Sequence, residues 1–198
     1  MKILIIRFSS IGDIVLTTPA VRCLKKQLSI DTEIHYLTKS AFASLLDQNP
    51  FIDKLWFLKP NISETIKEIK AEKFDLIIDL HNNLRTRLIK LACGIPSKTF
   101  IKLNFKKFLL TALKINILPH IHIVDRYFKA TSGLGVVNDG EGLDYFSPSS
   151  KEELENINSV FSQSQFVAMA IGGQHFTKRM PVSKLSKIIE GTHSIVIL

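Results

Sequence analysis

Apolar stretches and helical patterns alternate from residue 2 to residue 134 of this chain. Stretches rich in apolar residues, with the length of strands, lie at residues 2–7, 33–37, 54–58 and 74–80. Between them, apolar residues recur every three or four positions, as Ile62, Ile66 and Ile69 do, which is typical of a helix with one buried face. Apolar strands that alternate with helices indicate a parallel sheet covered on both sides. The pattern therefore predicts an α/β, Rossmann-like fold with helices on both faces of the sheet.

The predicted helices are bounded by residues that commonly start or stop a helix. Thr18 suits the N-cap of the first helix and Pro19 its first turn, while Gly94 and Pro96 stop the fourth. A short strand is also predicted at 99–101. The helices are predicted at residues 19–28, 40–46, 62–73, 84–92, 105–114 and 121–134.

A polar stretch then separates the first pattern from a second one. Residues 138–149 have the composition of a linker. After them come, in order, a predicted helix, strand, helix and strand, at 150–161, 166–171, 182–190 and 194–198. Because a sheet of two strands does not make a stable domain, we expect a C-terminally truncated protein of two domains. Its parts are a Rossmann-like domain at 1–137, a linker at 138–149 and an incomplete second Rossmann-like domain at 150–198.

The positive charge of the chain is concentrated in one segment. The net charge is +8, and residues 81–124 contain eight Lys or Arg and no Asp or Glu. Such a segment attracts phosphates, whether on a nucleic acid, a lipid head group or a small substrate. Within it, residues 102–114 form a basic amphipathic pattern. That helix either packs its apolar face on its own sheet, which is the commoner arrangement and our expectation, or lies on an anionic membrane surface.

The cysteine and histidine residues give no sign of a metal site. Cys23 and Cys93 lie in apolar, helix-like surroundings without a CxxC pattern, so we expect reduced thiols in a cytoplasmic protein. His120 and His122 flank one isoleucine, and at this spacing incidental histidines are commoner than metal ligands. No apolar run approaches the roughly 20 residues that a membrane span needs.

The loop after the first strand places polar residues where ligands usually bind. Ser9, Ser10, Gly12 and Asp13 follow the apolar run, and open parallel sheets bind ligands at the carboxyl ends of their strands. An aspartate there can accept a proton from a substrate hydroxyl, or it can cap the following helix. Spacing alone favours the cap. The loop lacks GxGxxG, which disfavours a nicotinamide cofactor.

Two further loops carry groups that bind anions. His81 and Asn82 follow the fourth predicted strand, and the nearby Arg85 and Arg87 could hold an anionic sugar or a phosphate. The alternative there is a capped helix with exposed arginines. The stretch GGQHFTKR at 172–179 follows a later strand, and its glycine N–H groups and cations suit a phosphate. It is not a Walker A loop, and an ordinary glycine turn with solvated cations explains it equally well.

Four stretches of the sequence together resemble one family, the ADP-heptose:lipopolysaccharide heptosyltransferases (glycosyltransferase family nine). In the family's order, they are KILIIRFSSIGDIVLTTPAVRCLKK, FDLIIDLHNNLRTRLI, HIVDRYFKA and GGQHFTKRMP. The resemblance implies the GT-B fold, with an acceptor-binding N-terminal domain and a nucleotide-sugar-binding C-terminal domain. The sequence departs from the family at Met180, where a tryptophan is common, and at HNNLR, which replaces QGLLR.

The resemblance also implies a reaction. A heptose-like sugar would move, with inversion and without a metal, from a nucleotide-diphosphate donor such as ADP-heptose to lipopolysaccharide core. Asp13 matches the family's general base, and Lys178 matches the residue that contacts the donor's phosphates. The residues expected to bind the donor phosphates are Gly172, Gly173, Gln174, Thr177 and Lys178. The residues expected to bind the acceptor are Ser9, Ser10 and Gly12, which match the family's loop, and His81, Asn82, Arg85 and Arg87, which are assigned by their own chemistry and not by the resemblance.

These implications define a leading function and its rival. We expect a cytoplasmic, monomeric glycosyltransferase, peripheral to the inner membrane, with no cofactor beyond its nucleotide-sugar co-substrate. Its partners would be the donor, a lipopolysaccharide core or lipid A-type acceptor, and the membrane surface. Nucleic acid is disfavoured, because the sequence contains no recognised module and few aromatic residues among its cations. The alternative is a non-catalytic, Rossmann-like module that binds anions or a membrane surface.

Overall fold

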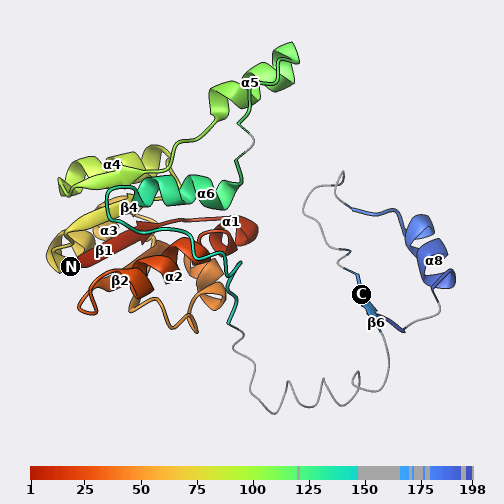
Figure 1. Ribbon diagram of the computed structural model, residues 1–198, viewed down its shortest axis with the longest axis horizontal. Helices are drawn as coiled ribbons and strands as arrows, with labels where there is room; N and C mark the ends of the chain where they lie inside the picture. The colour runs from red at the N-terminus through yellow and green to blue at the C-terminus, as the bar shows by residue number, and fades with distance from the viewer. Residues whose placement is uncertain are drawn as a thin grey trace. The chain divides into compact units, whose positions relative to one another are not determined.

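The first part of the chain folds around a parallel sheet. The computed structural model describes residues 1–119, 121–146, 166–169, 171, 176, 179–192 and 195–197, in two compact units at Met1–Pro148 and Ser149–Leu198. In the first unit five strands lie in the order β3-β2-β1-β4-β5 (Figure 1), and every neighbouring pair is parallel. The strands are β1 (Lys2–Ile6), β2 (Glu33–Thr38), β3 (Lys54–Phe57), β4 (Leu76–Asp79) and β5 (Ser97–Thr99). The predicted α/β sheet is confirmed.

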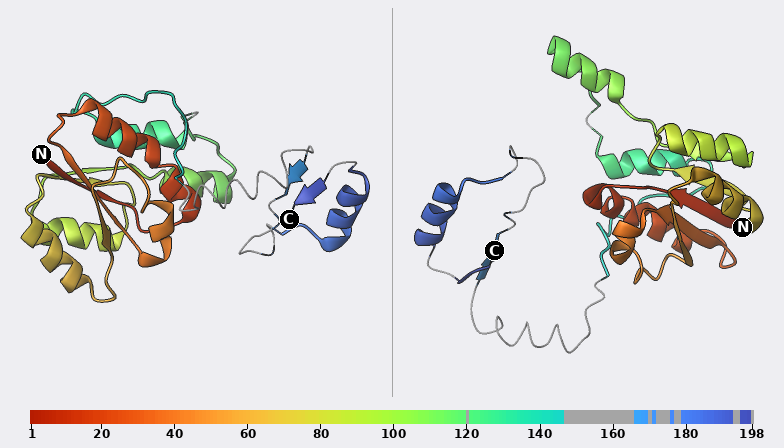
Figure 2. Two further views of the ribbon diagram at one scale, coloured as in Figure 1. Left: turned by 90° about the horizontal axis from the view of Figure 1, so that it is seen from below. Right: turned by 180° about the vertical axis from the view of Figure 1, so that it is seen from behind.

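Helices cover both faces of this sheet (Figure 2). Along β1, Ile3 and Ile5 join one core cluster and Leu4 and Ile6 join the other, because successive side chains of a strand point to opposite faces. The first cluster contains residues of α2 and α6, and the second contains residues of α3 and α4. The helices are α1 (Ile11–Val15), α2 (Thr18–Gln27), η1 (Ser40–Leu45), α3 (Ile62–Glu72), α4 (Leu84–Cys93), α5 (Asn104–Leu113), α6 (Ile123–Phe128) and η2 (Lys129–Thr131).

Local sequence signals explain where helix α4 begins and ends. At the start of α4, the Asn83 side chain accepts a hydrogen bond from the backbone N–H of Thr86 at 2.9 Å, and the Thr86 hydroxyl accepts one from Asn83 N–H at 3.0 Å. The helix ends at Gly94, whose φ of 66° suits a residue without a side chain. This reciprocal cap sets the direction in which α4 leaves the end of β4.

Two predicted helices differ from those observed. The helix predicted at 19–28 begins one residue earlier, and Thr18 is its first residue rather than its N-cap. The Thr18 hydroxyl donates instead to the carbonyl of Val15, which closes the short α1 onto α2. The helix predicted at 121–134 is shorter, because the chain tightens into the 3₁₀ turn η2 after Phe128.

The expectation that residues 102–114 pack an apolar face on the sheet is wrong for α5. Phe108 and Leu113 are 59% and 58% exposed, and none of the described residues of α5 belongs to either core cluster. The helix projects from the layered body of the first unit (Figures 1 and 2). Both faces of the sheet are already covered by the other helices, so α5 is left without a place in either core.

Residues 137–144 lie against α2. The guanidinium of Arg22, which is 2% exposed, donates to both carboxylate oxygens of Asp139 at 2.7 and 2.9 Å and also pairs with Asp144. Gln27 exchanges two hydrogen bonds with the backbone of Val137, at 2.7 and 2.9 Å. The carboxylates raise the pKa of Arg22, and the same hydrogen bonds lower the pKa of Asp139. The predicted division into a domain, a linker and a second domain stays a prediction.

The second unit contains a parallel sheet of two strands among the described residues. Strands β6 (Phe166–Ala168) and β7 (Ile195–Ile197) pair in parallel, and helix α8 (Val182–Glu190) connects them. The bounds of α8 match the prediction. The helix predicted at 150–161 lies outside the described residues. Among the described residues, no helix combines the length and the hydropathy that a membrane crossing requires.

Candidate functional site at the carboxyl end of the sheet

The loop after β1 orients the carboxylate of Asp13. Ser10 is the N-cap of α1, and Asp13 lies in the first turn of that helix. The Ser10 hydroxyl donates to Asp13 Oδ2 at 3.0 Å, and the Ser10 backbone N–H lies 3.4 Å from the same oxygen. Asp13 thus contributes to capping α1, because its carboxylate accepts from the backbone of the N-cap residue. Its side chain is nevertheless 41% exposed, so the carboxylate is also accessible to a ligand.

Arg7 holds this carboxylate from the end of β1. Its buried guanidinium places Nη2 2.6 Å from Asp13 Oδ2. Its other nitrogens donate to the carbonyls of Ser9 and Leu80, each at 2.7 Å. One side chain therefore ties together the end of β1, the following loop and the end of β4. Arg7 was not among the predicted site residues, although a cation that ends an apolar strand is a visible signal.

The pKa of Asp13 reflects these contacts. Partial burial by itself would raise the pKa, but the charge of Arg7 and the hydrogen bonds from Ser10 outweigh it and hold the pKa below its ordinary value. Asp13 is therefore ionised at neutral pH and can accept a proton. The pairing with Arg7 keeps the carboxylate in place and also makes it a weaker base.

The loop after β4 is built on a second carboxylate. Asp79 is fully buried, and its Oδ1 accepts hydrogen bonds from the backbone N–H groups of His81 at 3.0 Å and Asn82 at 2.7 Å. Its Oδ2 lies 2.8 Å from the ammonium of Lys90 on α4. The side-chain amide of Asn82 donates to the carbonyl of Phe100 at 2.9 Å. These contacts fix the path of the chain past the carboxyl end of β4.

His81 is held as a neutral imidazole in this loop. Its ring packs against Phe8, with 5.0 Å between the ring centroids. Its Nδ1 is buried without a hydrogen-bond partner among the described residues. Burial, followed by the charges of Arg7 and Lys102, lowers the pKa of His81 to about 4. At neutral pH it contributes an uncharged ring to the site rather than a further cation.

Two cavities with cationic walls lie at this end of the sheet and share Phe100 and Lys102; we call them together the basic crevice. The smaller one has a volume of about 220 Å³ and is lined by Arg7, Asp13, Phe100, Lys102, Leu103, Ile123, Arg126 and Tyr127. The larger one has a volume of about 560 Å³ and is lined by Asn82, Arg87, Lys90, Thr99, Phe100, Ile101 and Lys102. The only carboxylate in these linings is that of Asp13. The crevice therefore presents one proton acceptor within a surface that favours anionic ligands.

The predicted site residues are divided between the crevice, its support and the remainder of the chain. Asp13, Asn82 and Arg87 line the basic crevice. The carbonyl of Ser9 accepts a hydrogen bond from Arg7, and the hydroxyl of Ser10 donates one to Asp13. The other three predicted acceptor residues do not line the crevice. Arg85 is an exposed cation on α4, Gly12 lies in α1 with open space around it, and His81 is the neutral imidazole. The five residues predicted to bind the donor lie outside the described residues.

Besides Arg7, three cationic residues of the crevice were not predicted individually. Lys90 and Lys102 belong to the segment without acidic residues, so the charge count contained their signal. Arg126 comes from α6, and its guanidinium lies 4.8 Å from the centroid of the Phe100 ring and donates to the carbonyl of Ile101 at 2.8 Å. These contacts depend on the folded path of residues 100–102, which periodicity does not predict.

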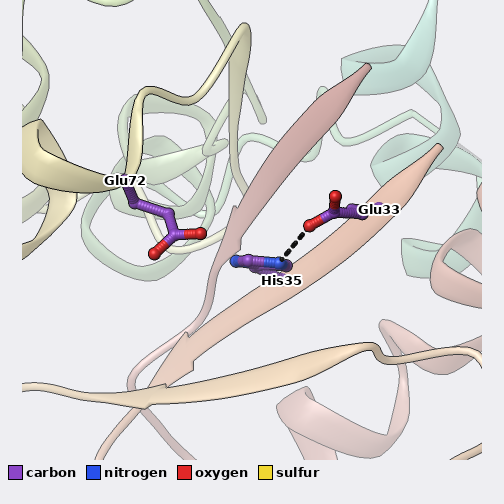
Figure 3. Close-up of side chains that lie close together, drawn as sticks. All are labelled: Glu33, His35 and Glu72. Atoms are coloured by element: carbon purple, nitrogen blue, oxygen red, sulfur yellow. Dashed lines mark hydrogen bonds and ion pairs between the residues drawn. The ribbon is translucent and has the colours of Figure 1, made fainter. Parts of the chain in front are cut away.

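A cluster at the opposite, amino end of the sheet brings together Glu33, His35 and Glu72 (Figure 3). Their nearest ligand atoms lie within 4.8 Å of one another. However, the ammonium of Lys2 lies 2.6 Å from Glu72 and 3.4 Å from Glu33. His35 Nδ1 accepts a hydrogen bond from Trp56 Nε1 at 3.0 Å, so Nε2 carries the proton and donates to Glu33 at 3.2 Å. The cluster is therefore a network of ion pairs and hydrogen bonds rather than a set of free metal ligands.

Comparison with known proteins confirms the resemblance drawn from the sequence, although no family model matches the chain. The chain is 27% identical over 141 residues to lipopolysaccharide heptosyltransferase 1 of Campylobacter coli, an alignment that covers 67% of this chain and 41% of the relative. The chain thus spans less than half the length of the curated relative that it matches.

Solved structures show the same fold. A glycosyl transferase family 9 protein from Veillonella parvula matches with a TM-score of 0.73 and 22% identity, over 96% of this chain and 58% of that one. The E. coli ADP-heptose lipopolysaccharide heptosyltransferase II matches with a TM-score of 0.69 and 19% identity, over 99% and 63%. The E. coli heptosyltransferase WaaC with ADP matches with a TM-score of 0.63 and 15% identity, over 99% and 67%.

Proposed function

We propose that this chain contains the acceptor-binding part of a glycosyltransferase that transfers a heptose-like sugar from a nucleotide-diphosphate donor to lipopolysaccharide core. The observation that carries the proposal is the position of Asp13. Its ionised, partly exposed carboxylate is the only proton acceptor among the cations of the basic crevice. The names of the similar proteins, which are heptosyltransferases, support the same chemistry.

In the proposed reaction Asp13 acts as the general base. It takes the proton of an acceptor hydroxyl while that oxygen forms a bond to the anomeric carbon of the donor sugar. The bond between that carbon and the phosphate oxygen breaks, and the nucleoside diphosphate leaves with the electron pair, so the anomeric configuration inverts. Lys178 would balance the charge of the leaving group, and no metal is required. Arg7 and Ser10 keep the carboxylate in the orientation that this transfer needs.

The basic crevice is suited to an acceptor that carries acidic groups. Arg87, Lys90 and Lys102 line its larger cavity, and cations of this kind bind carboxylates and phosphates through charge-assisted hydrogen bonds. A lipopolysaccharide core or lipid A-type acceptor bears such groups. We propose ADP-heptose as the donor and co-substrate, with Gly172, Gly173, Gln174 and Thr177 beside Lys178 at its phosphates. The protein would act as a cytoplasmic monomer, peripheral to the inner membrane, without nucleic acid.

The proposed base is tested by Asp13→Asn in the full gene product, with ADP-heptose and deacylated core as substrates. The substitution removes the proton acceptor but keeps the shape of the side chain. We expect sugar transfer to fall at least about a hundredfold, with acceptor binding retained. Asp47→Asn, an exposed carboxylate outside the crevice, is the matched control and should transfer at the original rate. Undiminished transfer by Asp13→Asn would refute the base; absence of transfer in the unsubstituted protein, with anion binding intact, would favour the non-catalytic module.

A further inference from the structure

Helix α5 and the chain after it expose apolar side chains that a globular domain normally buries. Phe108 and Leu113 are more than half exposed on the helix, and Ile115 and Ile117 are 50% and 45% exposed just after it. The helix projects from the body of the first unit in two opposite views (Figures 1 and 2). Neighbouring exposed apolar side chains of this size mark a surface that binds something.

Helix α4 adds an apolar stripe of its own. Leu84, Leu88 and Leu91 are 73%, 47% and 81% exposed. Their spacing of four and three residues places them on one side of the helix. Arg85 and Arg87 are exposed on the same helix, so α4 combines leucines with cations, as α5 combines apolar residues with lysines.

The charge of this region indicates the chemistry of the partner. Both helices belong to the segment 81–124, which has eight cations and no acidic residue. A partner that covers it must therefore tolerate or supply negative charge. A protein surface rich in acidic groups would pair with the cations but would leave the apolar side chains in a polar environment. An anionic lipid bilayer matches both, because its phosphates attract lysines and its acyl region accepts apolar side chains.

A cavity beside α5 has the same mixed character. It has a volume of about 290 Å³ and is lined by Thr99, Ile101, Leu103, Lys106, Pro119, Ile121, Arg126 and Lys129. Three of these side chains are cationic, and the others are mostly apolar. Such a lining suits a phosphate with the first methylene groups of a chain attached to it.

We propose that α5, the chain that follows it to Ile117, and the exposed leucines of α4 form a surface that docks on an anionic lipid bilayer. The proposal rests on the membrane location assigned under the proposed function and names the surface responsible for it. Docking of this kind combines apolar insertion with electrostatic attraction and needs neither Asp13 nor a donor. Its failure can therefore be told apart from failure of the transfer reaction.

The test is co-sedimentation of this chain with vesicles of phosphatidylglycerol and phosphatidylcholine, or of phosphatidylcholine alone. We expect binding to the anionic vesicles that weakens with salt, and little binding to the neutral ones. Phe108→Ser should weaken binding about tenfold, because a large apolar side chain no longer enters the bilayer. Ile30→Ser changes an apolar residue that is 94% exposed in the loop between α2 and β2, and it should bind as the original chain does.

A second pair of variants tests the charge. Lys114→Gln should weaken binding about fivefold, since each cation near an anionic surface contributes on the order of 1 kcal/mol. Lys39→Gln removes an exposed lysine away from α4 and α5 and should have no effect. Circular dichroism verifies the fold of each variant.

Four outcomes would overturn the proposal. They are equal binding to both kinds of vesicle, no binding to anionic vesicles, equal losses in the Phe108 and Ile30 variants, or self-association of the chain that Phe108→Ser abolishes. A chain that binds vesicles as expected but transfers no sugar in the full gene product would leave the docking surface intact and reject the proposed function instead. Transfer to a deacylated, water-soluble acceptor should be unaffected by Phe108→Ser.

Discussion

The two ends of the sheet differ in how their charged side chains are paired. At the amino end, carboxylates and lysines are matched: Lys2 bridges Glu33 and Glu72, and Lys25 pairs with Asp53 at 2.7 Å. The hydrogen bonds of Lys25 and Ile34 outweigh the effect of burial and lower the pKa of Asp53. These five charged side chains are all paired with one another, so the network contributes to the fold and leaves little field for a ligand.

At the carboxyl end, the linings of the basic crevice contain five cationic side chains and a single carboxylate. Asp13 pairs with Arg7, and the buried Asp79 pairs with Lys90, but the cations of this concave region still outnumber the carboxylates. Such a surplus serves folding poorly, because like charges repel, but it attracts an anionic ligand. The comparison shows that the balance of charge within a cluster, rather than the number of charged residues, separates the candidate site from structural ion pairs.

The largest expected effect comes from breaking the buried pair at the carboxyl end. Lys90→Met removes the partner of the fully buried Asp79 and the hydrogen bond to Thr99 at 2.6 Å that ties α4 to β5. Because an uncompensated carboxylate would remain buried, we expect the free energy of unfolding to fall by about 3 kcal/mol. Urea unfolding, followed by circular dichroism, measures it.

Lys2→Met makes the matching change at the amino end. The Lys2 pairs are more exposed, with 26% of the lysine side chain accessible, so water can solvate the carboxylates that it leaves behind. The loss of stability should be clearly smaller than for Lys90→Met. Equal losses in the two variants would mean that the two ends of the sheet do not differ in the way described.

The next effect concerns the base itself. In Arg7→Met the carboxylate of Asp13 loses its positive neighbour 2.6 Å away, so the pKa of Asp13 should rise. Carboxyl NMR of Asp13 during a pH titration measures this directly. In the full gene product, the acid limb of the pH–rate profile should move to higher pH by the same amount, because transfer needs Asp13 ionised.

The sign of the linked stability change follows from the direction of this shift. The pKa of Asp13 is depressed in the folded protein, so its contribution to stability is present above the unfolded pKa and is lost as the pH falls through the folded pKa. In Arg7→Met the pKa of Asp13 is no longer depressed by this cation, so that contribution should shrink and stability should depend less on pH in the acidic range. Arg7→Lys keeps the charge and should leave the pKa of Asp13 low, whereas an unchanged pKa in Arg7→Met would exclude Arg7 as its cause.

Sequence reasoning predicted the sheet, because the sheet depends on local patterns, and the same patterns suggested where a candidate site would lie. Apolar runs predicted β1 and β4. Because ligands bind at the carboxyl ends of parallel strands, Asp13 and the loop at His81 were predicted to belong to the site. Helix α8 was predicted with its observed bounds, because its apolar spacing is regular and glycine follows its last residue.

The partners of these residues could not be predicted in the same way. Arg7 was assigned to the end of a strand, and only the folded path of residues 9–13 brings Asp13 back to it. Lys90 meets Asp79 because β4 and α4 turn about Asn83. The apolar spacing of α5 predicted a helix with an apolar face but contained no information on what would cover it. Long-range contacts of this kind depend on the tertiary structure.

The smallest expected effect is at Glu33, His35 and Glu72, whose grouping in Figure 3 resembles a metal site. Zinc added in solution should leave the melting temperature of the chain unchanged. Lys2 already supplies the positive charge that a metal would bring, and the His35 nitrogen nearest Glu33 carries a proton rather than a free electron pair. A stoichiometric zinc-binding signal in calorimetry that disappears in His35→Gln would show that zinc displaces Lys2, and the amino end of the sheet would then be a ligand site as well.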